Sequence, residues 1–135
     1  MLGGAARIGA GRWSDRLGAR IVPLRRIGAA LTVALAASAA LVDASTWLLV
    51  PALVVAGTLG LSWNGLSYTA AAERAGAARS GAAIGIQQTA LALGGIAVPI
   101  TFAAVVGAAS WRLGFFLVAL CPLAGFVALR PLAER

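Results

Sequence analysis

The feature that most constrains this chain is a set of four long stretches without any charged residue. They cover residues 27–42, 44–72, 80–110 and 113–129. A helix that crosses the hydrocarbon core of a bilayer needs about 20 predominantly apolar residues, with a range of about 17–25. The stretches are rich in Ala and Leu and lack the period-two alternation of strands, and an open sheet in lipid would leave backbone groups unpaired. The sequence therefore predicts an all-α polytopic integral membrane protein.

The composition supports the same fold class. Hydrophobic residues make up 61% of the 135 residues and charged residues 11%, whereas soluble domains average about 45–50% and about 25%. A chain of this size could not bury that excess in a single core, so we expect membrane lipid to be its solvent and partner. The four transmembrane helices are predicted over 24–42, 47–71, 81–105 and 112–130.

The distribution of basic residues predicts the orientation in the membrane. The net charge of +7 comes from arginine alone, because the chain has no Lys and no His. With this helix order, ten of the eleven arginines lie on one side of the membrane, and only Arg112 lies on the other. The positive-inside rule then predicts cytoplasmic N- and C-termini in the plasma membrane, with 131–135 as a cytoplasmic tail. The exclusive use of arginine and the abundance of Ala and Gly are typical of a GC-rich bacterial genome.

Several function classes are disfavoured by what the sequence lacks. Without His, and with Cys121 as its one cysteine, the chain has no cluster for a metal, no disulfide framework and no Ser/His/Asp arrangement. The acids are scattered along the sequence: Asp15, Asp43, Glu73 and Glu134. We therefore expect no enzyme activity and no cofactor. Nucleic-acid binding is also not expected, because no aromatic side chains form a stacking platform among the arginines and no soluble fold presents them.

One charged segment, GRWSDRLGARIVPLRR over residues 11–26, contains an ordered pattern as well as positive charge. Its positions follow G-x-x-x-D-R-x-G-x-R, with Gly11, Asp15, Arg16, Gly18 and Arg20. Glycines at both ends would allow a tight connection with positive φ angles. We expect a cytoplasmic loop over 11–23, in which the aspartate caps or faces a helix N-terminus and the two arginines pair with acids or helix C-terminal carbonyls.

This pattern closely resembles the cytoplasmic-loop motif of the major facilitator superfamily (MFS) of secondary transporters, where it recurs between the second and third and between the eighth and ninth helices. The resemblance implies a charge relay at the cytoplasmic end of the interface between the two halves of the transporter, stabilising the outward-facing state. Asp15 would be the switch carboxylate, and Arg16 and Arg20 its cationic partners. Ala19 departs from the family, which often has Arg there, and this departure weakens the relay.

The resemblance also suggests which part of a twelve-helix transporter the chain corresponds to. Residues 1–10 would be the cytoplasmic end of a truncated transmembrane helix, because ten helical residues cover only about 15 Å. The second predicted helix has no membrane arginine, LALGGIAVPI lacks the G-P-x-x-G-G antiporter motif, and the chain ends soon after its last helix. These features favour a C-terminal fragment, from the end of helix 8 through helix 12, over helices three to six. The missing N-terminal helices would then be partners in cis or in trans.

Polar residues within the predicted membrane helices are functional candidates, because they are costly in lipid unless paired. The candidates for lining the path of a small-molecule solute are Asn64, Tyr68, Gln87 and Gln88. The alternative is that these side chains hold helices together by hydrogen bonds. Gly81 and Gly85 form a GxxxG-type face for close helix packing. No acid lies deep in a helix, so the coupling ion, the direction of transport and the solute stay open.

The function implied by the resemblance is transmembrane transport of a small solute by alternating access, with no transport by this chain alone. A dimeric four-helix exporter of the small multidrug type is an alternative, but such exporters need a carboxylate in the first helix, and IGAALTVALAASAALV has none. A membrane interaction or assembly subunit is the other alternative. It would use the small-residue faces as docking surfaces.

Overall fold

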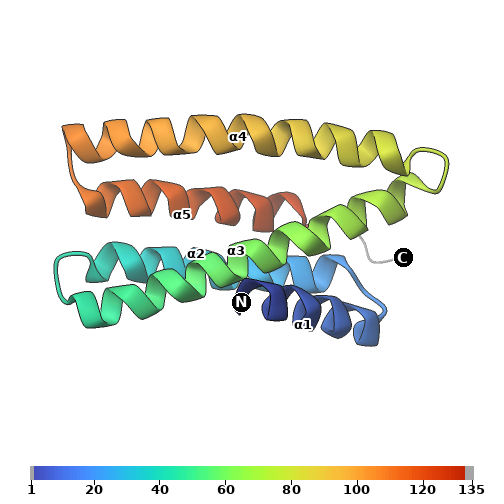
Figure 1. Ribbon diagram of the computed structural model, residues 1–135, viewed down its shortest axis with the longest axis horizontal. Helices are drawn as coiled ribbons and strands as arrows, with labels where there is room; N and C mark the ends of the chain where they lie inside the picture. Colours follow the sequence, from blue (N-terminus) through green and yellow to red (C-terminus); the bar gives the residue numbers. More distant parts are fainter. Residues whose placement is uncertain (1, 133–135) are drawn as a thin grey trace.

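The structure, a computed structural model, describes residues 2–132 and contains five helices over that range. In chain order they are α1 (Leu2–Leu17), α2 (Ile21–Leu41), α3 (Thr46–Ala75), α4 (Ser80–Ala108) and α5 (Trp111–Ala128) (Figure 1). No strand is present among the described residues. Most of the expected tail, including Glu134 and Arg135, lies outside them.

Four of the helices, α2 to α5, are long and apolar enough to cross a membrane. They have 18–30 residues, and their most apolar windows have a mean hydropathy of 1.4–2.1. Helical structure satisfies the backbone hydrogen bonds within each segment, which is the requirement for crossing lipid. The predicted all-α polytopic membrane fold is therefore confirmed.

The helix ends differ from the predicted ranges by several residues. The first membrane helix begins at Ile21 rather than at 24, because Pro23 falls in the first turn, where its missing N–H has no intrahelical partner to lose. The second continues to Ala75 and the third to Ala108, beyond the predicted 71 and 105. The α3 extension contains the good helix formers Ala, Glu and Arg, and Gly76 with a φ of 75° ends the helix.

The prediction of a loop over 11–23 is wrong for residues 11–17, which are helical. Residues up to Leu17 belong to α1, and the chain is non-helical only over 18–20. Gly11 therefore lies inside a helix with no atom within 4 Å of the position a Cβ would take, and it opens no tight connection. The glycine that ends the helix is Gly18, which has a φ of 59°.

The helices form two antiparallel hairpins, α2–α3 and α4–α5, with α1 against the first. At the centre, α2 packs on both α3 and α5, while α4 packs on α3 and α5 and α1 packs mainly on α3. The α2–α3 and α4–α5 turns lie at one end of the bundle, and the α1–α2 and α3–α4 connections lie at the other (Figure 1). This arrangement gathers the arginine-bearing segments at a single end.

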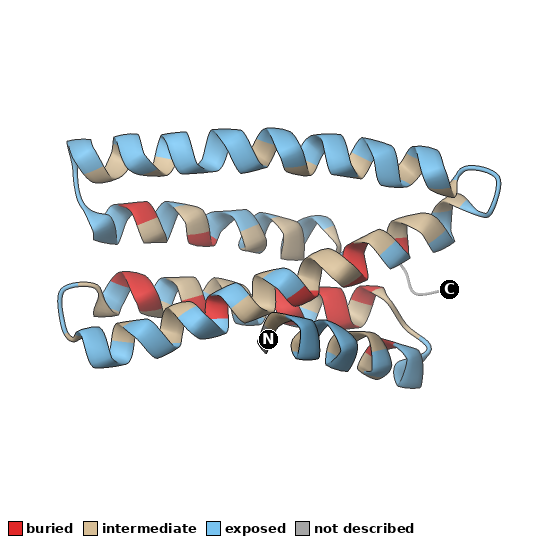
Figure 2. Cartoon of the chain, viewed as in Figure 1, coloured by how far each residue is buried: buried red, intermediate tan, exposed pale blue. Residues whose placement is uncertain are grey.

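Burial is concentrated between α2 and α3, where a hydrophobic cluster comprises Ile21, Leu24, Ile27, Leu66 and Ala70. By contrast, α4 has no buried residue along its length (Figure 2). A helix that is apolar all round and uncovered by its own chain requires an apolar solvent or a partner on its outer faces.

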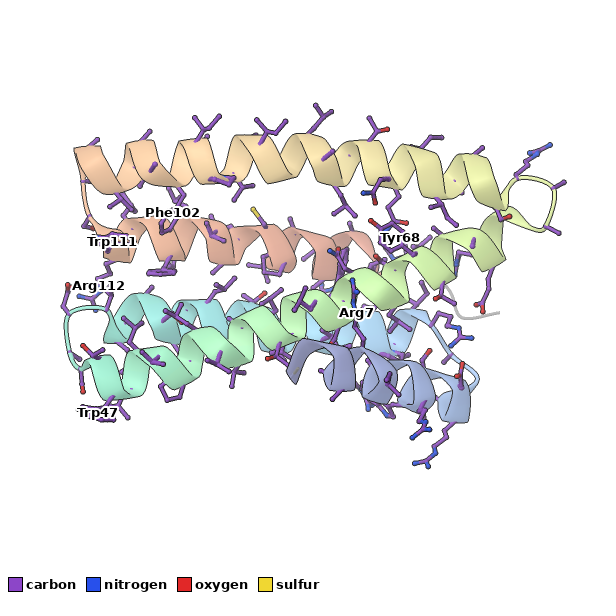
Figure 3. All side chains as sticks on the ribbon, in the orientation of Figure 1. Arg7, Trp47, Tyr68, Phe102, Trp111 and Arg112 are labelled. Atoms are coloured by element: carbon purple, nitrogen blue, oxygen red, sulfur yellow. The ribbon has the colours of Figure 1, made fainter. Side chains whose placement is uncertain are left out.

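Two exposed tryptophans lie at the end of the bundle opposite the arginine-rich end. Trp47 is 89% exposed and Trp111 is 55% exposed, and both lie at the same end of the bundle as Arg112 in Figure 3. Amphipathic aromatic rings are enriched where a membrane helix meets the headgroup region. The placement of both tryptophans at this end agrees with a role as interfacial anchors.

Candidate functional site

The candidate site begins at the turn between α1 and α2, which is a helix C-cap built around Gly18. The Gly18 N–H donates to the Asp15 carbonyl at 3.2 Å, and the Ala19 N–H donates to the Ser14 carbonyl at 3.3 Å. These two bonds, with a glycine at positive φ, form a Schellman motif. The Ser14 hydroxyl, fully buried, donates to the Ala19 carbonyl at 2.7 Å and closes the turn. The D-R-x-G part of the motif is thus the end of a helix.

This geometry corrects the capping part of the expected role of Asp15, although the carboxylate does contact Arg20, the residue that precedes α2. Its carboxylate lies in the last turn of α1, where the helix dipole is unfavourable to negative charge, and it does not cap the N-terminus of another helix among the described residues. Its stabilising partner is Arg20, whose Nη1 is 2.6 Å from Asp15 Oδ1. The motif therefore supplies both the acid and the cation that offsets it, five residues apart.

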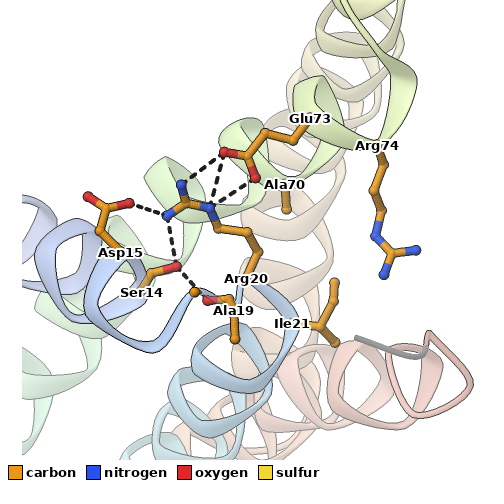
Figure 4. A pocket seen from close by; sticks show the side chains of 9 residues that line it. Ser14, Asp15, Ala19, Arg20, Ile21, Ala70, Glu73 and Arg74 are labelled. Atoms are coloured by element: carbon orange, nitrogen blue, oxygen red, sulfur yellow. Dashed lines mark hydrogen bonds and ion pairs between the residues drawn. The ribbon is translucent and has the colours of Figure 1, made fainter. Parts of the chain in front are cut away.

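Arg20 joins three helices through one guanidinium (Figure 4). Its Nε lies 3.0 Å from Glu73 Oε2 and its Nη2 lies 2.9 Å from Glu73 Oε1, a two-point contact with the end of α3. Nη1 donates to the Ser14 hydroxyl at 3.0 Å as well as to Asp15. The hydrogen bonds that Arg20 donates to Glu73, and then the one to Asp15, raise the pKa of Arg20 above its ordinary range, so this side chain keeps its charge. We call Ser14, Asp15, Arg20 and Glu73 the Arg20 network.

The network borders a cavity of about 340 Å³ at the arginine-rich end of the bundle. Its wall also includes Gly18, Ala19, Ile21, Ala70 and Arg74 (Figure 4). The other predicted cationic partner, Arg16, is exposed and forms no hydrogen bond or ion pair with the rest of residues 2–132. The structure therefore brings together only one of the two predicted cations with the acid.

Sequence reasoning missed Glu73 as a member of this site. A signal was present, because Glu73 is the single acid between the second and third charge-free stretches and stands beside Arg74 in the sequence. The buried hydroxyl of Ser14 was also missed, and no sequence signal separates it from an ordinary helix-end serine. It is identified only by its two hydrogen bonds.

A second arginine contact ties α1 to α3 farther from this end. Arg7 Nε donates to the Leu61 carbonyl at 3.0 Å, and its stem lies over Gly65, where a Cβ would be 3.6 Å from Arg7 Nε (Figure 3). The absence of a side chain at Gly65 lets the long arginine stem lie against the helix. Arg7 thus adds a contact beyond the charge that the sequence assigned to it.

The polar residues predicted within the membrane meet between α3 and α4. The Tyr68 hydroxyl donates to Gln88 Oε1, and Gln87 Nε2 donates to the Ser67 hydroxyl at 2.7 Å. Figure 3 shows Tyr68 lying between the two helices. These bonds connect α3 to α4, as expected if the polar side chains hold the helices together. Other polar groups of the cluster remain able to form further hydrogen bonds.

Two groups in this α3–α4 region have unused hydrogen-bonding capacity. The Gln87 Oε1 atom is buried and accepts no hydrogen bond from any residue that the structure describes. Asn64 is half-buried, and its side chain forms no hydrogen bond within residues 2–132. A carbonyl acceptor and a free amide beside the bonded pairs can bind a polar group of a solute or a water molecule.

The expected close helix contact at Gly81 and Gly85 is not formed among the described residues. Both glycines are exposed, and no atom lies within 4 Å of where their Cβ atoms would be. They lie on a face of α4 that this chain leaves uncovered, so any close packing there needs a surface from outside residues 2–132. Those residues also contain no group of three or more potential metal-ligating His, Cys, Asp or Glu side chains.

Comparison with known proteins places the chain beside membrane transporters. It is 34% identical over 124 residues to an uncharacterized MFS-type transporter of Mycobacterium tuberculosis strain CDC 1551 / Oshkosh, and 35% identical over 124 residues to one of strain ATCC 25618 / H37Rv. No family model matches the chain, and no solved structure matches it significantly. Each alignment covers 92% of this chain but 28% of the relative. Nearly the whole chain is therefore similar to little more than a quarter of two MFS-type transporters.

Proposed function

We propose that this chain forms the last four transmembrane helices, with the end of the helix before them, of an MFS-type transporter that moves a small solute by alternating access. The observation that carries the proposal is the Arg20 network, because it joins residues of the family-like motif to a third helix at the arginine-rich end of the bundle. The similarity to MFS-type transporters over 92% of the chain supports it. Alternating access requires two bodies that rock against each other, so this chain alone is expected not to transport.

In this function the Arg20 network keeps the ends of α1, α2 and α3 together as one rigid body. The Asp15 side chain is 65% exposed, and of its two carboxylate oxygens only Oδ1 is bonded to another described residue. Its second oxygen would face the opposing half and bind there in one of the two transport states. Arg16, exposed beside it, would then act across the same interface and not within this chain.

The proposed solute path follows the polar side chains between α3 and α4, with Gln87 Oε1 as an acceptor for a solute N–H or O–H group. We expect the replacement of both Gln87 and Gln88 with leucine to reduce transport at least about tenfold, because removal of one hydrogen bond to a solute already costs about 0.5–1.5 kcal/mol. The host for this test is a chimera in which the chain replaces its aligned segment in the mycobacterial relative, and uptake of a panel of labelled small solutes is measured against the unmutated chimera.

A matched control comes from the same helix. The Thr89 hydroxyl bonds only the Gly85 carbonyl of its own helix, so Thr89→Val should leave transport within about twofold at equal expression. Unchanged uptake by the double-leucine chimera, with a normal amount of protein in the membrane, would reject the solute path. The transporter assignment would survive that result, because interhelix hydrogen bonds also account for the cluster.

The proposed orientation, with both termini cytoplasmic, is testable by cysteine labelling. In a Cys121→Ser background, Ala44→Cys places a thiol in the α2–α3 turn and Ala78→Cys places one in the α3–α4 connection; both positions are exposed. A membrane-impermeant maleimide added to intact cells should label the thiol at position 44 and spare the one at 78 until the membrane is permeabilised. The reverse pattern would contradict the positive-inside orientation.

A further inference from the structure

The ends of α2 and α5 at the arginine-rich end carry two guanidinium groups over one aromatic ring. Arg25 lies 4.9 Å and Arg130 lies 5.3 Å from the centroid of the Phe126 ring. The two cations are therefore at most about 10 Å apart. Neither forms an ion pair with a carboxylate of residues 2–132, where the only ion pairs are those of Arg20. The ring holds the pair in place, and no carboxylate of residues 2–132 neutralises its charge.

The buried part of this cluster lacks a hydrogen-bond acceptor. Arg25 Nε is shielded from solvent and has no hydrogen-bond partner within residues 2–132. A buried donor without an acceptor is destabilising compared with a bonded one. An anion placed beside the two guanidinium groups would supply acceptor oxygens and reduce the repulsion between the cations.

The surface next to the cluster has the character of a membrane-facing helix. Leu123, Phe126 and Val127 follow i, i+3, i+4 spacing along α5, so they share one face, and Arg130 lies in the turn directly after the helix. Leu123 is 41% exposed and Val127 is 49% exposed. An apolar stripe that ends in an arginine at the charged end of the bundle matches an acyl chain that continues into a phosphate group.

We propose that Arg25, Phe126 and Arg130 form a binding site for an anionic phospholipid. The phosphate accepts hydrogen bonds from the outer N–H groups of the two guanidiniums, and an acyl chain lies on Leu123 and Val127. Phe126 stacks with the guanidiniums and fixes their positions at the level of the headgroups. Basic pockets between transmembrane helices suit anionic headgroups because charge and fork geometry both match phosphate. Free inorganic phosphate would not use the apolar stripe, so the lipid is the ligand.

The test titrates the purified full chain in neutral detergent with dioleoyl phosphatidylglycerol or dioleoyl phosphatidylcholine, and native mass spectrometry measures the bound fraction. We expect a preference for phosphatidylglycerol. Arg25→Gln and Arg130→Gln should each weaken phosphatidylglycerol binding about fivefold, because one arginine near an anionic headgroup is worth about that factor. Arg12→Gln is the matched control, since Arg12 is exposed on α1 and has no ion pair within residues 2–132. It should change binding by less than about twofold.

The outcomes distinguish a specific phospholipid site from nonspecific electrostatic attraction between the arginines and anionic lipid. Equal weakening by Arg12→Gln and Arg130→Gln, equal binding of the two lipids, or full displacement of the lipid by inorganic phosphate would each overturn the proposal. If Arg25→Gln fails to fold, Arg130→Gln tests the proposal, because Arg130 is exposed. Arg25→Lys then gives a second readout, because it keeps the charge but loses the planar fork, and it should weaken binding by less than the about fivefold expected of Arg130→Gln.

Discussion

Replacing Arg20 with glutamine should lower the free energy of unfolding by about 1–2 kcal/mol, more than any other single loss of a polar contact in this chain. The substitution removes a two-point contact with Glu73 and the contact with Asp15, and it leaves both acids without a cation. Glu73 is 49% exposed and Asp15 is 65% exposed, so water and salt reduce the loss below that of a buried pair. Thermal unfolding in detergent, followed by circular dichroism, measures the change.

Double-mutant cycles measure separately how strongly Glu73 and Asp15 are coupled to Arg20. The coupling of Arg20→Gln with Glu73→Gln should exceed its coupling with Asp15→Asn, since Glu73 accepts through two oxygens and Asp15 through one. Arg16→Gln is the control and should change stability by less than about 0.5 kcal/mol, as expected for an unpaired surface charge. Equal effects of Arg16→Gln and Arg20→Gln would show that net charge, and not the network, matters.

The raised pKa of Arg20 determines how this network responds to pH. A group whose pKa is raised on folding contributes stability that is fully present below its unfolded pKa and is lost only as the pH rises through its folded pKa. For Arg20 both values lie far above neutrality. Its contribution is therefore constant through the neutral range, and Arg20 itself gives the network no pH switch there.

Gly114→Val should destabilise the α4–α5 hairpin by about 1–3 kcal/mol, the usual cost of overpacking. A Cβ at Gly114 would lie 2.9 Å from Phe102 Cε2 and 3.0 Å from Val106 Cγ2, closer than van der Waals contact allows. The Phe102 ring is restrained by Trp111 and Phe115, whose ring centroids are 5.8 and 5.3 Å away. The ring therefore cannot turn aside without losing edge-to-face contacts. The melting temperature in detergent is the measurement.

The control for this prediction is a glycine of α4 that faces open space. Gly107 has no atom within 4 Å of the position a Cβ would take, so Gly107→Ala should be neutral or stabilising by up to about 1 kcal/mol through helix propensity. Gly114→Ala should fall between the two, because propensity and the clash oppose each other. A Gly114→Val protein as stable as the parent would mean that α5 moves away from α4 without cost.

The membrane-spanning helices could be predicted from the sequence, whereas the candidate site could be predicted only in part. Runs without charge fix where helices cross a membrane, because a charge in lipid is costly whatever the neighbouring helices do. The resemblance of the motif to the family implied Arg16 and Arg20 as partners of Asp15, and the structure places Arg20 Nη1 2.6 Å from Asp15 Oδ1. The sequence did not show that Gly11 lies within a helix, because helix propensity near a charged turn is weak. The end of that helix depends on the φ angle of one residue, Gly18, which forms the Schellman cap.

The sequence by itself determined the four apolar helices, the gathering of basic charge at alternate connections and the family-like motif, because all three follow from local composition and order along the chain. Only the tertiary structure decided that Glu73 completes the Arg20 network, that Gln87 and Gln88 bond across to α3, and that Gly81 and Gly85 face an uncovered surface. These facts depend on how each helix is rotated about its axis. The rotation is set by packing between helices, which a nearly uniform apolar sequence does not encode locally.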